Sequence, residues 1–192
     1  MKNTGELCRL IVIQSKRAAL ERIQQQYPGA TIIDVTSRGT QPWVRFSPFY
    51  PHGNIPVPFS PGHLSTSVEG IWQGLKVFER ADVDPARFKV TTMKNLKRSA
   101  RTYGNVLGHR QGVTSERLLS YAEARRAIYL PAYHWVLENC LQDLLADLQT
   151  QAAKQTVILL DYETNCDLSD LARPLSHAGL VKRYLEGDWP AE

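Results

Sequence analysis

The chain has 192 residues, a formal net charge of +4 at pH 7 and three cysteines. This length can bury a hydrophobic core and fits one domain spanning residues 1–192. The cysteines lack the spacing of a disulfide framework or a zinc site: they are Cys8, Cys140 and Cys166. No apolar run reaches the ~20 residues that span a bilayer, and the first residues lack the apolar core of a signal peptide. We therefore expect a cytoplasmic protein with reduced thiols, no metal, no cofactor and no membrane partner.

The first part of the chain has the pattern of a β-α-β unit. An apolar run predicts a buried strand over 8–14, and 17–27 has the pattern of a helix that Pro28 and Gly29 end. Residues 31–35 predict a second strand. The opening of the chain thus predicts a small sheet with a helix beside it.

A proline-rich stretch follows between Trp43 and Gly62. Five of the chain's eleven prolines lie between Pro48 and Pro61, so this segment is neither a helix nor a central strand. A rigid loop that carries aromatic rings suits stacking on a flat heterocycle, because it loses little entropy on ordering. For each ring the alternative is a place in the core; the rings are Phe46, Phe49, Tyr50 and Phe59.

The next segment, 65–79, has the pattern of a helix with Ser65 or Ser67 as its N-cap. On a helix of this length, polar residues at i, i+4 and i+7 share one face, and here they are Glu69, Gln73 and Lys76. A carboxylate, an amide and an ammonium in one row suit the wall of a polar cleft. The alternative is a surface helix with ordinary charged residues.

These two stretches together resemble the NAD- and ADP-ribose-associated (NADAR) superfamily. Residues 46–51 read F-S-P-F-Y-P, similar to the family's F-S-N-F-Y-P segment, and Ser67 to Lys76 resembles its S-x-E-x-x-x-Q-x-x-K helix. A weaker similarity continues from Gly108 to Leu148. Asp161 resembles an acidic residue of the family, but the W-G ending that follows it there is missing. The resemblance implies a helix-rich fold and cleavage of N-glycosidic bonds, either in a riboflavin-pathway intermediate or between ADP-ribose and guanine.

A basic segment without acidic residues follows the helix, and phosphate is a natural partner for such a cluster. It contains Lys89, Lys94, Lys97, Arg98 and Arg101, and Arg110 comes shortly after it. The alternative is a solvated charged surface. A glycine-punctuated loop is predicted next, over 103–112, with neither a P-loop nor a dinucleotide spacing.

The second half is mainly helical. Ser120 and Glu123 form a capping box that opens a helix to about Tyr129, and Pro131 suits the first turn of a long amphipathic helix to Leu148. The clearest strand, 156–162, ends near Asp161, and 176–186 predicts a last helix.

We therefore predict a single α+β domain, mainly helical, with a small β-sheet and a NADAR-like fold. Its expected activity is N-glycosidic hydrolysis of an ADP-ribosyl or related nucleotide-like substrate, and ADP-ribosylated nucleic acid is a further expected substrate. The alternatives are a non-catalytic ADP-ribose or nucleotide binder and a nucleic-acid-binding protein. An oxocarbenium-like sugar calls for a carboxylate near the anomeric carbon, and a desolvated lysine can attack an opened ribose aldehyde or bind a phosphate or sugar hydroxyl. The expected catalytic residues are Glu69, Lys76 and Asp161, and the expected substrate-binding residues are Phe46, Ser47, Tyr50, Trp72, Gln73, Arg98, Arg101 and Arg110.

Overall fold

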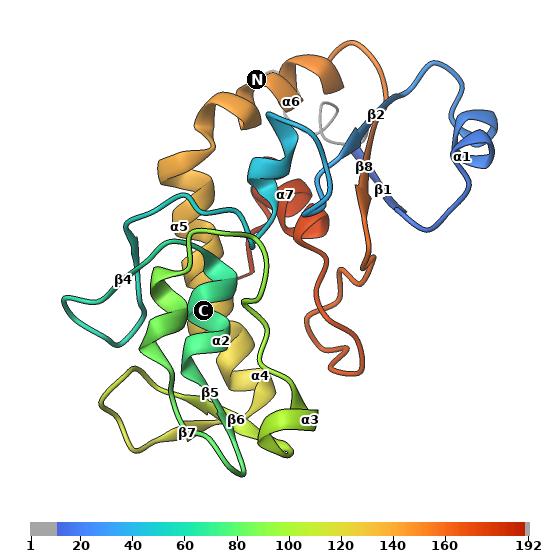
Figure 1. Cartoon of the computed structure of the whole chain (residues 1–192). Helices are drawn as coiled ribbons and strands as arrows, with labels where there is room; N and C mark the ends of the chain where they lie inside the picture. Colours follow the sequence, from blue (N-terminus) through green and yellow to red (C-terminus); the bar gives the residue numbers. More distant parts are fainter. Residues whose placement is uncertain (1–10, 191–192) are drawn as a thin grey trace. The chain divides into compact units, whose positions relative to one another are not determined.

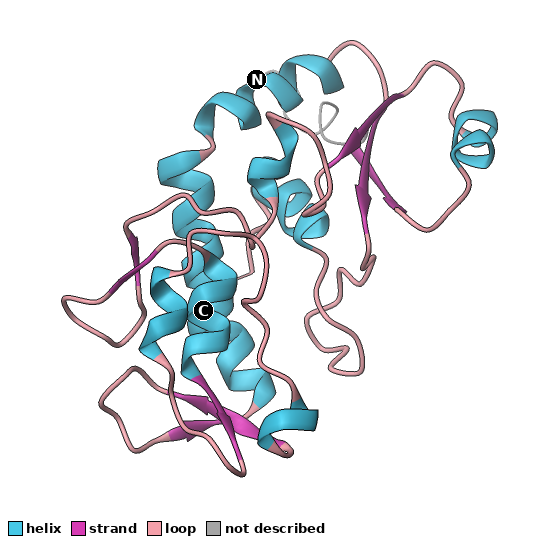
Figure 2. Ribbon diagram, viewed as in Figure 1, coloured by secondary structure: helices cyan, strands magenta, loops and turns pink. Residues whose placement is uncertain are grey.

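The computed structural model describes residues 11–190 and contains both helices and small sheets, as Figures 1 and 2 show. The α+β class expected from the sequence is confirmed. Two compact units can be distinguished: unit 1 holds 11–47 and 141–190, and unit 2 holds Pro48–Cys140. None of the helices within 11–190 is long and apolar enough to cross a bilayer.

Unit 1 contains a three-stranded parallel sheet in the order β1-β8-β2, with strands β1 (Ile11–Ser15), β8 (Val157–Asp161) and β2 (Thr31–Asp34). All five residues of β8 are buried, which explains its unbroken apolar sequence. The three predicted strands are confirmed, although the start of the first, with Cys8, lies outside the described residues.

Three further helical segments and a 3₁₀ turn complete unit 1. They are α1 (Leu20–Gln26), the 3₁₀ turn η2 (Trp43–Phe46), α6 (Gln142–Ala152) and α7 (His177–Leu185). Helices α6 and α7 both contact β8. The Ser176 side chain accepts a hydrogen bond from the Gly179 N–H at 3.0 Å and so caps α7, as its short polar side chain allows.

Unit 2 is built on helix α2 (Val68–Leu75) and a small antiparallel sheet in the order β5-β6-β7. The strands of this sheet are β5 (Lys76–Phe78), β6 (Val106–Arg110) and β7 (Leu118–Leu119). The other elements are β3 (Ile55–Pro56), β4 (Leu64–Ser65), η3 (Pro85–Lys89), α3 (Ala100–Tyr103), α4 (Tyr121–Ala124), the π-helical turn η4 (Arg125–Tyr129) and α5 (Leu130–Cys140). Figure 1 shows α2, in green, beside α5, and these two helices contact each other.

The central helix is shorter than the predicted 65–79. Ser67 caps it, and it ends at Leu75 because the next three residues form β5 and pair with β6. Lys76 therefore lies on a strand, and the predicted helical face of three polar residues is wrong at its third position. The predicted loop 103–112 is wrong for the same reason, since part of it forms β6. Pairing between distant segments decides both cases, which local propensity cannot indicate.

The second half of unit 2 also departs from the sequence pattern. A new helix was predicted to start near Pro131 and to run to Leu148, but the helical run continues from α4 through η4 into α5, and α6 begins only at Gln142. In the π-helical turn, the Leu130 N–H donates to the Arg125 carbonyl, five residues back. This wider turn changes the hydrogen-bond register just before a proline that has no N–H to donate. The capping box at Ser120 and Glu123 is confirmed.

Helix α2 is enclosed on nearly all sides, including the side that carries its polar residues. Every residue from Val68 to Leu75 is buried except Trp72, which is half-buried. Gly74 permits the close approach of η3, because a Cβ built on Gly74 lies 2.2 Å from Cε1 of the buried Phe88 ring. The position of the polar row thus depends on a tightly packed helix.

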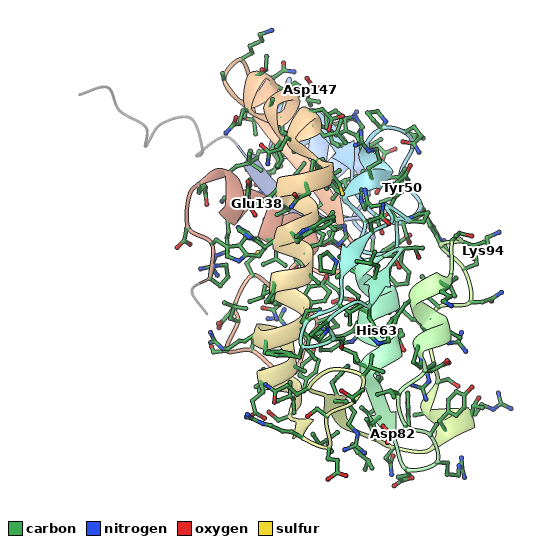
Figure 3. The ribbon with its side chains drawn as sticks, turned by 90° about the vertical axis from the view of Figure 1, so that its left-hand side faces the viewer. Tyr50, His63, Asp82, Lys94, Glu138 and Asp147 are labelled. Atoms are coloured by element: carbon green, nitrogen blue, oxygen red, sulfur yellow. The ribbon has the colours of Figure 1, made fainter. Side chains whose placement is uncertain are left out.

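Gly74→Ala should lower the free energy of unfolding by about 1–3 kcal/mol, the usual cost of overpacking a core. A helical alanine would otherwise stabilise the protein relative to glycine. Urea denaturation of the variant beside Asp147→Ala, which truncates an exposed α6 residue labelled in Figure 3, measures the effect. A stability gain for Gly74→Ala would contradict the tight contact with Phe88.

Candidate functional site

Glu69 is a buried carboxylate in the first turn of α2. Glu69 is only 7% exposed, and its backbone N–H donates to the Pro48 carbonyl at 2.8 Å. The Gln73 Nε2 donates to Glu69 Oε1 at 2.9 Å, as the i, i+4 spacing on a helix allows. The sequence therefore placed these two side chains together correctly, but on an enclosed face.

Gln73 also connects α2 to the basic segment. Its Oε1 accepts a hydrogen bond from the Arg98 N–H at 3.0 Å. The Arg98 guanidinium donates from Nη1 to the Lys76 carbonyl at 2.7 Å and from Nη2 to the Asp82 carbonyl at 2.8 Å. Arg98 is buried, and most of its donors thus bind the backbone of its own unit.

The surroundings of Glu69 and Lys76 bring the pKa values of these two side chains closer together. Burial raises the pKa of Glu69 above its usual value, against the opposing effects of Gln73, Lys97 and Lys76. Burial also lowers the pKa of Lys76, and Lys97 and Arg98 lower it further, whereas Glu69 raises it. A carboxyl group with a raised pKa and an amine with a lowered one are both shifted toward the range in which acid–base chemistry runs near neutral pH.

His109 is a member of this cluster that sequence reasoning missed. It lies directly opposite Lys76 in the β5–β6 pairing, and its ring centroid is 3.8 Å from that of Trp72. The Lys76 Nζ lies 5.9 Å from the Trp72 ring centroid. His109 is 1% exposed, and neither of its ring nitrogens has a hydrogen-bond partner among residues 11–190. Burial and the nearby Lys76 lower the pKa of His109 from 6.5 to about 3, so the ring is neutral at physiological pH.

The remaining basic residues divide into two groups. Arg110 forms an ion pair with Asp82 at 2.8 Å, so this guanidinium is engaged by the protein. In contrast, Lys94, Lys97 and Arg101 are exposed, and Lys94 points away from the ribbon in Figure 3. Lys97 also lies over the half-buried ring of Phe49 at 5.4 Å.

The predicted aromatic loop divides between the two units. In unit 1, Phe46 is fully buried and its ring is parallel to that of Trp43 at a centroid distance of 6.3 Å, and Ser47 is buried beside it in sequence. In unit 2, Tyr50 is half-buried, with its ring centroid 4.8 Å from that of His52. Of the three predicted substrate-binding residues in this loop, Phe46, Ser47 and Tyr50, only Tyr50 lies in the same unit as Glu69.

Asp161 lies in unit 1, at the end of β8, and its carboxylate is engaged by α7. Its Oδ2 accepts hydrogen bonds from Ser176 Oγ at 2.8 Å and the Ala178 N–H at 3.2 Å, and lies 3.0 Å from His177 Nδ1. His177 Nε2 is 2.8 Å from the Val35 carbonyl. With both nitrogens facing oxygen atoms, His177 is suited to the protonated form.

The pKa values of this pair shift in opposite directions. Burial alone would raise the pKa of Asp161, but the charge of His177 and the hydrogen bonds outweigh it, so the pKa is lowered. Burial would lower the pKa of His177, but Asp161 outweighs it, so the pKa is raised. Asp161 therefore joins the strand end to α7, a role that the predicted catalytic assignment did not include. Among residues 11–190, no group of three or more His, Cys, Asp or Glu side chains is placed to hold a metal ion.

The chain belongs to a family of unknown function, DUF6939, whose model matches residues 15–181. This match overturns the resemblance to the NADAR superfamily, for which no family model matches. The motif from Ser67 to Lys76 does not form one helix in this protein, because Lys76 lies on β5 and not on α2. No curated protein and no solved structure matches the chain.

The buried pair of Asp161 and His177 predicts a defined pH dependence of stability. Because the pKa of Asp161 is lowered in the folded protein, this residue stabilises the fold above its ordinary pKa of 3.8. That stabilisation is lost as the pH falls through the folded pKa. Because the pKa of His177 is raised in the folded protein, this residue stabilises the fold fully below its ordinary pKa of 6.5. That stabilisation is lost as the pH rises through the folded pKa. Asp161→Asn should therefore cost most, about 3 kcal/mol of unfolding free energy, between these two ordinary pKa values.

Asp34→Asn, at the end of β2, is the matched control. Its ion pair with Lys16 at 2.9 Å is partly exposed, so this variant should lose less than about 1 kcal/mol. Denaturant unfolding over a pH series distinguishes the two. Equal losses in both variants, or a loss for Asp161→Asn that does not change with pH, would contradict the buried ion pair.

Proposed function

We propose that unit 2 carries the site of a hydrolase that cleaves the N-glycosidic bond of a nucleotide-like substrate. The observation that supports this proposal is the pair formed by the buried Glu69, whose pKa is raised, and Lys76, whose pKa is lowered. A surface helix with ordinary charged residues would not perturb both groups in opposite directions. Perturbed acid–base pairs of this kind are typical of catalytic sites.

Glu69 gives one proton and Lys76 takes up one proton during the proposed reaction. Glu69 and Lys76 share one proton, and in the form of the pair that reacts it is on Glu69, which donates it to the ring nitrogen of the leaving base as the C–N bond breaks, so that the sugar gains oxocarbenium character. Neutral Lys76 accepts a proton from the water that attacks the anomeric carbon. The products are the free base and the sugar, and transfer of one proton from Lys76 to Glu69 restores both groups.

The surrounding residues suit the other parts of a nucleotide. The cations Lys94, Lys97 and Arg101 are exposed in the same unit and are available to a phosphate. The half-buried Tyr50 offers an aromatic face to a base. ADP-ribosyl compounds are the substrate class to test first, since they combine an N-glycosidic bond with phosphates. Cytoplasmic location remains part of this proposal.

Glu69→Gln should lower turnover by about 100-fold or more, the usual effect of losing a general acid, with little effect on folding. Chromatographic detection of released base, with a panel of NAD, ADP-ribosylated guanosine, nucleoside monophosphates and flavin-pathway phosphates, measures the rate. Glu138→Gln, which changes an exposed carboxylate on α5 labelled in Figure 3, is the control.

The stability of Glu69→Gln is a second measurement on the same variant. Because the folded pKa of Glu69 is raised, burying the charged form weakens folding as the pH rises, and the neutral glutamine avoids this cost. The variant should be as stable as the parent or more stable at neutral pH. Parental turnover in Glu69→Gln would contradict the assignment, and tight binding by the parent without base release would favour the non-catalytic nucleotide binder.

A salt series separates a phosphate site from a nucleic-acid surface. With Arg98 and Arg110 engaged by the protein, four exposed cations of the predicted basic set remain: Lys89, Lys94, Lys97 and Arg101. Binding to one phosphate group should fall modestly with salt, whereas duplex DNA binding falls with a log–log slope of about −0.9 per phosphate contacted. Tight, steeply salt-dependent binding to a random duplex, without nucleotide binding, would contradict the proposal and support a nucleic-acid-binding protein.

A further inference from the structure

His109 carries an unmet hydrogen-bonding capacity at the candidate site. Buried polar side chains in native proteins are almost always hydrogen-bonded, and an unpaired one costs about 1–3 kcal/mol. Both His109 nitrogens are buried, and neither has a partner among residues 11–190. An apolar ring would fill the same space without that cost. A histidine at this position therefore calls for a partner that binds from outside the chain.

The position of His109 indicates where such a partner binds. In the β5–β6 ladder, residues directly opposite each other place their side chains on the same face, and His109 is opposite Lys76. Trp72 lies against the imidazole, with 3.8 Å between the two ring centroids, and is itself half-buried. A ligand group that reaches His109 is therefore next to Lys76 as well.

The chemistry of the two side chains selects a hydroxyl group. A neutral imidazole has one nitrogen that donates and one that accepts, and an amine or ammonium donates to oxygen. A hydroxyl oxygen can accept from Lys76 while its hydrogen is donated to the unprotonated His109 nitrogen. A dianionic phosphate can accept from the His109 N–H but has no proton for the acceptor nitrogen, whereas a hydroxyl can both accept and donate.

We propose that His109 is a substrate-positioning residue that binds a sugar hydroxyl together with Lys76, so that the site recognises ribosyl ligands over deoxyribosyl ligands. This inference rests on the proposed function for the choice of a sugar as ligand. It extends that function by assigning the sugar to β5 and β6 and the phosphate to the exposed lysines and arginine.

The test uses AMP, 2′-deoxy-AMP and 3′-deoxy-AMP as probes in calorimetric binding to the full chain, in the Glu69→Gln background if AMP is consumed. The parent should bind AMP about tenfold more tightly than at least one deoxy analogue, the difference expected for one lost hydrogen bond. His109→Phe should lose this preference and keep or raise the melting temperature. His63→Phe, at an exposed histidine of the same unit labelled in Figure 3, should keep the preference.

Two outcomes would overturn the inference: a parent that binds no AMP or binds all three nucleotides equally, and a His109→Phe variant that retains the ribose preference. A fall in melting temperature for His109→Phe with the preference retained would make His109 a structural residue. ¹⁵N NMR supplies a readout independent of affinity, since AMP should shift the imidazole signal that is missing in His109→Phe.

The proposed hydrolase and the ribose preference can fail separately. If no compound of the panel releases base but AMP shifts the His109 signal, the hydrolase fails and ribosyl binding stands. If base release depends on Glu69 but His109→Phe discriminates as the parent does, the hydrolase stands and the role of His109 is wrong.

Discussion

The side-chain amide of Gln73 is the interaction on which the candidate site depends. It donates to the Glu69 carboxylate and accepts from the backbone of Arg98, so one buried residue holds both the acid and a central residue of the basic segment. Arg98 in turn binds the carbonyl of Lys76 and so holds the end of α2 where the chain becomes β5. Helix, strand and basic segment are thus held by one connected set of hydrogen bonds.

This arrangement places polar groups where burial is costly. Glu69 is buried and its pKa is raised, Lys76 is half-buried and its pKa is lowered, and neither nitrogen of His109 has a hydrogen-bond partner within 11–190. Buried polar groups without full compensation reduce stability, and proteins retain them mainly at functional sites. Unit 1 presents the opposite case, because Asp161 is also buried but has close partners in Ser176 and His177.

The features predictable from the sequence are those with a local physical signature. The apolar run of β8, the capping box at Ser120 and the i, i+4 pair of Glu69 and Gln73 each follow from adjacent residues. The end of α2 and the strand that carries His109 do not, because both depend on pairing between segments about thirty residues apart in the chain. His109 had no signal of its own in a glycine-rich segment. Asp161 was placed correctly at a strand end, but its partner His177 comes from a distant helix.

The most direct measurement of the central claim is a ¹³C NMR titration of the Glu69 carboxyl in the parent and in Lys76→Met. If Glu69 is a buried acid stabilised in its charged form by Lys76, it titrates above its ordinary value of 4.5 in the parent, and its pKa rises further when the lysine charge is removed. A Glu69 pKa at or below 4.5, unchanged by Lys76→Met, would contradict the acid–base pair and the function proposed from it.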